Sequence, residues 1–229
     1  MKRIAAITGM EAEARLARDA GLVAMASGGV AAQTLAFAEA AIKDGAAALV
    51  SFGIAGALAP HLASGTLLLP RAVIAEDGTQ YAVDEAWRAQ VEAASRAAAL
   101  PLETGDIFGA EAAIAAAEQK AALHRKTGAV AVDLESHLVA RVAAKTGTPF
   151  LVLRAIADPA TRTLPPAALD GLGADGKPAL GRVLLSVARS PLQIAALIRL
   201  AGDTRRALSA LGSALKTRPF DAADEGRVR

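Results

Sequence analysis

The chain has 229 residues, which is enough for one large α/β domain and marginal for two. It contains no cysteine and its three histidines lie far apart, which excludes disulfides and zinc-type ligand spacing, so we expect no metal. The formal net charge of only +2 gives little support to nucleic-acid binding, and no apolar run approaches the roughly 18–20 residues that span a bilayer, so we expect a cytoplasmic protein.

Apolar runs separated by turn residues predict strands that alternate with helices. Gly21 ends the first predicted helix, and Glu76-Asp77-Gly78 marks a turn between two later strands. The predicted strands cover residues 4–7, 22–26, 47–52, 66–74, 79–83, 102–108, 130–134 and 150–156, and the predicted helices cover residues 11–20, 30–43, 85–98, 111–126 and 136–145. This alternation predicts an α/β fold, in which a single domain has a mixed, mostly parallel central sheet flanked by helices.

A C-terminal helical extension is predicted after residue 190. Apolar residues recur there at helical spacing, and basic residues far outnumber the one acid, Asp203. The apolar positions are Leu192, Leu197, Leu200, Ala201, Leu208, Leu211 and Leu215, and the basic ones are Arg182, Arg189, Arg199, Arg205, Arg206, Lys216 and Arg218. We therefore divide the chain into a main domain (1–190), a basic amphipathic helix (191–218) and a flexible tail (219–229). Such a helix packs on its own domain, on a partner subunit or on an anionic membrane surface, and packing is the commoner case.

Four polar or glycine-rich segments follow predicted strands: Gly9–Glu13, Gly53–Gly56, Asp133–Glu135 and Arg154–Asp158. Ligands of such sheets bind where strands end and loops begin, so the four segments together predict a site.

Taken singly, each segment has a structural explanation. Thr8 and Glu11 fit a capping box, and the helix dipole favours Glu13. Gly53 and Gly56 allow a tight turn, Asp133 suits a helix start, and Arg154 with Asp158 suits an ion pair. Neither Ser27–Val30 nor Gly53–Gly56, which both follow predicted strands, spells G-x-G-x-x-G or carries a P-loop lysine, and the chain has no G-x-S-x-G, so we expect no cofactor.

In this order the segments GMEAEA, FGIAGALAP, AVDLESH and RAIADPA resemble the nucleoside phosphorylase and nucleosidase superfamily, especially the methylthioadenosine/S-adenosylhomocysteine nucleosidases. The resemblance runs from Ile4 to about Ala160. It implies a phosphorylase/hydrolase-like fold, cleavage of a purine N-glycosidic bond by the main domain, and a homo-oligomer.

The resemblance also implies a role for each residue. Asp158 would protonate the purine, Glu135 would hold the ribose hydroxyls, and Glu13 would activate water. Arg154 would support the carboxylates and the nucleophile, with Asp133 as a second partner. The substrate would be lined by Gly9, Met10, Gly53, Ile54, Phe108, Leu134 and Phe150. Ile54 and Ala157 stand where the family has serines, which removes a hydroxyl that contacts water or phosphate.

Five longer segments resemble a narrower family, the hopanoid-associated phosphorylases, over nearly the whole chain. These are GMEAEARLA, VSFGIAGAL, GAVAVDLESHLVARVAAKTGTPF, RAIADPATRTLPPAALDGL and RSPLQIAALIRLAGDTRRAL. This resemblance implies release of adenine from adenosylhopane, a lipid-linked adenine nucleoside, to give ribosylhopane or phosphoribosylhopane, with peripheral membrane contact. Water and phosphate both remain candidates for the co-substrate, with a slight preference for water because Glu13 is retained. Two alternatives stay open: cleavage of small 5′-alkylthioadenosines, and binding of an adenosyl lipid without cleavage.

Overall fold

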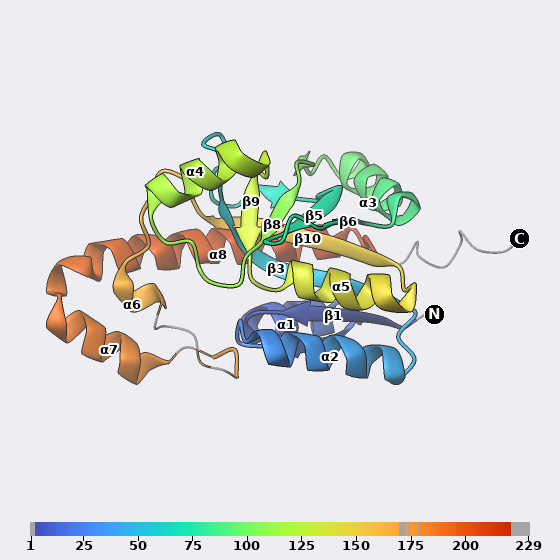
Figure 1. Ribbon diagram of the computed structural model, residues 1–229, viewed down its shortest axis with the longest axis horizontal. Helices are drawn as coiled ribbons and strands as arrows, with labels where there is room; N and C mark the ends of the chain where they lie inside the picture. Colours follow the sequence, from blue (N-terminus) through green and yellow to red (C-terminus); the bar gives the residue numbers. More distant parts are fainter. Residues whose placement is uncertain (1–2, 170–172, 174, 178, 221–229) are drawn as a thin grey trace, which may run out of the picture.

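The computed structural model describes residues 3–169, 173, 175–177 and 179–220 (Figure 1). The strands are β1 (Ile4–Thr8), β2 (Val23–Ala26), β3 (Ala48–Ala57), β4 (Leu67–Leu68), β5 (Ala72–Ala75), β6 (Gln80–Ala82), β7 (Leu102–Glu103), β8 (Ile107–Gly109), β9 (Ala131–Asp133) and β10 (Phe150–Asp158). The helices are α1 (Glu11–Asp19), α2 (Ala31–Lys43), α3 (Glu85–Ala97), α4 (Ala117–Thr127), α5 (Ser136–Thr146), α6 (Pro166–Leu169), α7 (Leu180–Arg189), the 3₁₀ turn η1 (Pro191–Gln193) and α8 (Ile194–Lys216).

Strand β3 is the centre of a mixed sheet. It pairs in parallel with β1 and β10, and its last two residues pair with β9 in the antiparallel direction. The sheet continues from β9 through β8 and β5 to β6, and from β10 through β4 to β7, while β2 lies beside β1. Most of these pairings are parallel, so the predicted α/β fold with a mixed, mostly parallel sheet is confirmed.

Helices cover both faces of this sheet. Helix α2 contacts α5 and β1, whereas α1 contacts α8, and α8 lies along β10. Because β2 and β3 flank β1 on opposite sides, right-handed crossovers place α1 and α2 on opposite faces. The α1 and α8 pair therefore covers one face and the α2 and α5 pair the other.

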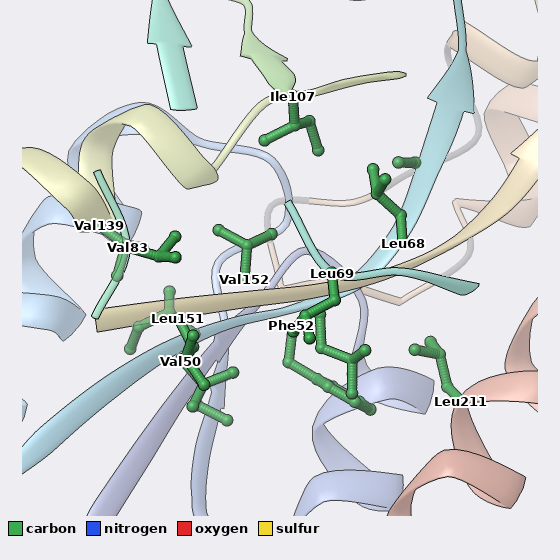
Figure 2. Packing of buried hydrophobic residues seen from close by; sticks show 14 of the residues in the cluster. Val50, Phe52, Leu68, Leu69, Val83, Ile107, Val139, Leu151, Val152 and Leu211 are labelled. Carbon is green, nitrogen blue, oxygen red and sulfur yellow. The ribbon is translucent and has the colours of Figure 1, made fainter. Parts of the chain in front are cut away.

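The core between these layers is aliphatic, as the 3% aromatic content requires. Figure 2 shows Val50 and Phe52 of β3 beside Leu151 and Val152 of β10, and Leu211 of α8 packs from one side. Phe52 and Leu151 are completely buried. Burying a side chain of this size contributes about 1.5–3 kcal/mol to the stability of the fold, so packing strongly stabilises the pair of β3 and β10.

Several helices and strands have bounds that differ from those predicted. The third strand continues to Ala57, so Gly53–Gly56 lies inside β3 rather than in a loop. The predicted strand 66–74 is two strands, because Pro70 between them has no N–H to give to a sheet. The predicted strand 102–108 is also two strands, and the helix predicted from Glu111 begins only at Ala117.

The C-terminal helix packs on its own domain over its second half. Ala207, Leu211 and Leu215 are buried there, whereas the earlier part of the predicted stripe is not. At the start of the predicted tail, Pro219 and Phe220 are buried, and the Phe220 ring lies edge-on to Trp87 at 5.9 Å. Residues 221–229 and the side chain of Arg182 lie outside the described part of the chain.

No helix among the described residues is long and apolar enough to cross a bilayer.

Candidate active site

A buried guanidinium lies at the centre of the predicted site. Arg154, opposite Gly53 in the β10–β3 pairing, is completely buried. Its Nη2 lies 2.6 Å from Asp133 Oδ2 and 3.1 Å from Glu135 Oε2, and it donates to Ser51 Oγ at 2.7 Å. Two carboxylates, Asp133 at the end of β9 and Glu135 just after it, are therefore held against one cation on β10.

Glu13 joins this cluster from the first turn of α1. Its Oε2 accepts a hydrogen bond from the Met10 N–H at 2.7 Å, and its Oε1 accepts one from the Ile54 N–H at 2.8 Å. The side chain is almost completely buried. Glu13 thus ties the start of α1 to β3, and its two oxygens have fixed positions.

Two glycines let the backbone come close to these carboxylates. A Cβ on Gly53 would lie 2.6 Å from Glu13 Oε1 and 2.6 Å from Arg154 Nη1, and its φ of +153° suits glycine. A Cβ on Gly9 would lie 2.8 Å from Glu135 Oε1. Both glycines are therefore required by the cluster rather than by a turn.

Burial shifts the pKa values of the clustered acids upward. Burial raises the pKa of Glu135 to about 7, against the attraction of Arg154, and Asp133 and Glu13 add repulsion. Burial also raises the pKa of Glu13, although Arg154 and the N–H groups of Met10 and Ile54 oppose it. The cluster therefore holds three carboxyl groups around one cation, and proton uptake relieves part of the excess negative charge.

Stability should consequently fall as pH rises. The folded pKa of Glu135, about 7, is above its ordinary value of 4.5, so the folded state holds a proton that the unfolded chain has already lost. Its contribution is complete below about pH 4.5 and disappears as pH passes 7. We expect wild type to lose on the order of 1–3 kcal/mol of unfolding free energy between about pH 5 and pH 8 from this group.

Urea unfolding at both pH values tests this expectation with Glu135→Gln as the comparison. Glu13 and Asp158, whose pKa values are also raised, are unchanged in the variant. Their contributions to the pH dependence of stability therefore cancel when the two proteins are compared. Equal pH dependence in the two proteins would contradict the assigned pKa of Glu135.

A second polar pair lies further along β10. Asp158, opposite Gly56, has its Oδ2 bonded to Lys120 Nζ, and Lys120 also donates to Arg162 O at 2.8 Å. The side chain of Lys120 is completely buried. Burial raises the pKa of Asp158, while Lys120 and Arg162 oppose the shift. Oδ2 is therefore occupied, and Oδ1 has no hydrogen-bond partner among the described residues.

A small apolar cluster lies in the same part of the sheet. Phe108 pairs with Val132 across β8 and β9, and Leu134 packs against both from the segment after β9. Val132 in turn lies opposite Gly56, the β3 partner of Asp158. The structure therefore places Phe108 and Leu134 beside the strands that carry the acids.

Phe150 is the one predicted site residue that the structure does not bring there. It begins β10 opposite Leu49, at the far end of the strand from Asp158, and belongs to the main core. Four extended residues separate it from Arg154, which is about 13 Å. Phe150 therefore lies away from Asp158 along β10, and its role in the pocket stays a prediction.

A comparison with protein families identifies the chain. The sequence profile of the phosphorylase superfamily matches residues 19–186. The chain belongs to the phosphorylase superfamily. This membership confirms the predicted enzyme class of nucleoside phosphorylases and nucleosidases. A search of curated protein sequences finds no match.

Solved structures share the fold of this phosphorylase-superfamily chain. An aspartate-to-asparagine mutant of the Helicobacter pylori 5′-methylthioadenosine nucleosidase, with 5′-methylthioadenosine in its active site, is 16% identical, with a TM-score of 0.68 over 94% of this chain and 99% of that one. The H. pylori futalosine hydrolase is 18% identical, with a TM-score of 0.68 over 94% and 97%. A Neisseria meningitidis 5′-methylthioadenosine/S-adenosylhomocysteine nucleosidase is 20% identical, with a TM-score of 0.68 over 94% and 98%. At these identities the likeness shows a shared fold.

Some structural explanations of the motif residues are wrong in this superfamily member. Glu11 does not close a capping box; it pairs with Arg18 at 2.9 Å, and Glu13 accepts the Met10 N–H instead. Arg154 pairs with Asp133 and Glu135 rather than with Asp158.

Asp133 keeps its expected structural role as well as its ion pair. It accepts a hydrogen bond from the Ser136 N–H at 3.1 Å at the start of α5.

Sequence reasoning missed three polar residues of the site. Lys120 carried no signal, because it stands among other polar residues of a predicted surface helix. Ser51 could have been found, since it is the one polar side chain in β3. Ser136 Oγ bonds both Ser51 Oγ, at 3.0 Å, and Asp133. The hydroxyls of Ser51 and Ser136 therefore extend the polar network around Arg154.

Proposed function

We propose that this protein cleaves the N-glycosidic bond of an adenine nucleoside, with Asp158, Glu135 and Glu13 as its working carboxyl groups. The observation that carries the proposal is the burial of all three, Asp158 on β10, Glu135 just after β9 and Glu13 on α1, each close to a buried cation. Burying so many ionisable groups costs free energy. Groups with shifted pKa values collected in this way are typical of functional sites.

The site has two ends, and each suits one half of a nucleoside. Arg154 and Asp158 are four residues apart on β10, which is about 13 Å of extended chain. The Arg154 end offers carboxylates for ribose hydroxyls. The Asp158 end offers a proton donor, and the apolar side chains of Phe108 on β8 and Leu134 after β9 suit a purine ring. The H. pylori relative with 5′-methylthioadenosine in its active site supports a ligand of this size.

The proposed reaction uses one acid and one base. Asp158, protonated on Oδ1, gives its proton to the purine, and the electron pair of the bond between the sugar and the base leaves with adenine. The Glu135 carboxylate stabilises the positive charge that develops on the ribose. Glu13 removes a proton from water as the water oxygen bonds to the sugar carbon. The products are adenine and the free sugar, and Glu13 passes its proton to solvent while Asp158 is reprotonated.

Water fits the site better than phosphate. An anion would need free N–H donors or a free cation, but the Met10 and Ile54 N–H groups already bind Glu13. The Glu11 N–H donates to Gly176 O at 2.9 Å, and Arg154 faces carboxylates. This supports hydrolysis, in agreement with the preference that Glu13 suggests.

For the substrate we propose adenosylhopane, on the five segments that resemble hopanoid-associated phosphorylases. Small 5′-alkylthioadenosines are the second candidate, which the fold shared with 5′-methylthioadenosine nucleosidases supports. A protein that only binds an adenosyl lipid would gain nothing from an acid held by a buried lysine, so the Lys120–Asp158 pair favours cleavage over mere binding.

Adenine release by the purified protein tests this proposal. Detergent-solubilised adenosylhopane and 5′-methylthioadenosine are each incubated without phosphate and then with it. We expect release without phosphate, and we expect Glu13→Gln to lower the rate by about 10²-fold or more because the water loses its base. Release that requires phosphate would overturn the hydrolytic step. Bound nucleoside that is never cleaved would instead support the binding protein.

A further inference from the structure

The helical arm formed by α7, η1 and the first two turns of α8 exposes an unusual amount of apolar surface. In Figure 1 this arm (residues 180–201) extends beyond the end of the sheet, joined to the body through α8. Leu192 is 95% exposed, Ile198 68% and Leu185 52%. Among the described residues, every large apolar side chain that is exposed lies between Leu169 and Ile198. Large apolar side chains exposed together on one helical arm indicate a binding face.

This exposure is built into the elbow between α7 and α8. Gln193 is buried, its Nε2 donates to Ser186 O at 2.8 Å, and its Oε1 accepts from the Ala167 N–H at 3.0 Å. One side chain therefore joins α6, α7 and α8. Because Gln193 is turned inward, its neighbour Leu192 is turned out to solvent.

The arm is also uniformly basic. Residues 180–201 contain three basic residues, Arg182, Arg189 and Arg199, and no acid. The exposed side chains of Arg189 and Arg199 have no carboxylate partner among the residues that the structure describes. The next acid along the chain, Asp203, is buried and bound by Arg162 and Arg206. No nearby acid on the arm therefore offsets its positive charge.

We propose that this arm binds the surface of an anionic membrane. Leu192 and Ile198 enter the boundary between headgroups and acyl chains, and Arg189 and Arg199 lie on the anionic headgroups. A second copy of the chain fits this face less well, because a two-fold contact would bring arginines against arginines with no acid between them. The proposal does not depend on the identity of the nucleoside.

The arm is also close in sequence to the active site. Gly176, four residues before α7, accepts the Glu11 N–H at the start of α1, and a Cβ on it would lie 3.1 Å from Gly9 O. Gly9 in turn contacts Glu135. The chain just before the arm is therefore anchored to the backbone at the start of α1.

Co-sedimentation of the full chain with vesicles tests the proposal. Vesicles of phosphatidylcholine alone are compared with vesicles that also contain phosphatidylglycerol, at low and high salt. We expect binding to the anionic vesicles only, weakened by salt. Leu192→Ser/Ile198→Ser and Arg189→Glu/Arg199→Glu should each lower this binding by at least about tenfold.

Arg125→Glu/Lys126→Glu on α4 makes the same change in net charge at another exposed site and should leave binding unchanged. Because the changed side chains are exposed, thermal unfolding should be the same in all variants. Equal binding by wild type and the arm variants would overturn the proposal. So would a failure to bind anionic vesicles, or a dimer that Leu192→Ser/Ile198→Ser dissociates while vesicle binding is unaffected.

Discussion

Asp158→Asn is expected to slow adenine release by about 10²–10⁴-fold while the nucleoside still binds. The amide keeps the size of the side chain and an oxygen for Lys120 Nζ, but it has no proton to give to the purine. The measurement is single-turnover release of adenine at saturating nucleoside, with binding followed separately by calorimetry. Release at the wild-type rate would show that another group protonates the base.

Lys120→Met separates the placing of Asp158 from its protonation. Methionine replaces the buried lysine stem without its charge, and Lys120 is the strongest influence that lowers the pKa of Asp158. The pKa of Asp158 should therefore rise further, and activity should persist to higher pH than in wild type. A uniform loss of activity at every pH would instead mean that Lys120 acts only by holding Asp158 in place.

Much of the fold could be predicted because apolar runs mark the strands and capping residues mark the helix ends, and both are local features of the sequence. The helix predicted over residues 85–98 is α3, and Asp84 caps it, its side chain accepting the Trp87 N–H at 2.9 Å. Gly53–Gly56 was misjudged because glycines usually mark turns. Here they continue a buried strand, and Gly53 is required by side chains from α1 and β10. No local pattern contains that requirement.

The site was predictable in part for the same reason. Glu13, Glu135 and Arg154 were placed together because each follows or ends a strand of one sheet. Lys120 could not be placed, because its burial depends on the return of the chain at Pro159–Arg162, far along the sequence. Phe150 was placed in the pocket by the family resemblance, and the structure puts it at the opposite end of β10 from Asp158.

Arg154→Met should have the largest effect on stability, a loss of about 3–5 kcal/mol near pH 8. The variant keeps the volume of the side chain roughly but leaves the buried carboxylates of Asp133, Glu135 and Glu13 without their cation. Urea unfolding measures the loss. It should be smaller near pH 5, where Glu135, with a pKa of about 7, carries a proton.

Arg88→Met is the matched control, since Arg88 is also largely buried but pairs with the partly exposed Glu85 and Glu92. Removing it should cost about 1 kcal/mol or less from its ion pairs, because those carboxylates keep their contact with water. Asp133→Asn added to Arg154→Met should restore part of the loss by removing one of the stranded charges. Equal losses in Arg154→Met and Arg88→Met would mean that packing, and not charge, holds the cluster. A larger loss in Arg154→Met than in Arg88→Met would instead mean that the guanidinium is needed to neutralise the three buried carboxylates. A fold that did not use these carboxylates for chemistry would have no reason to bury them.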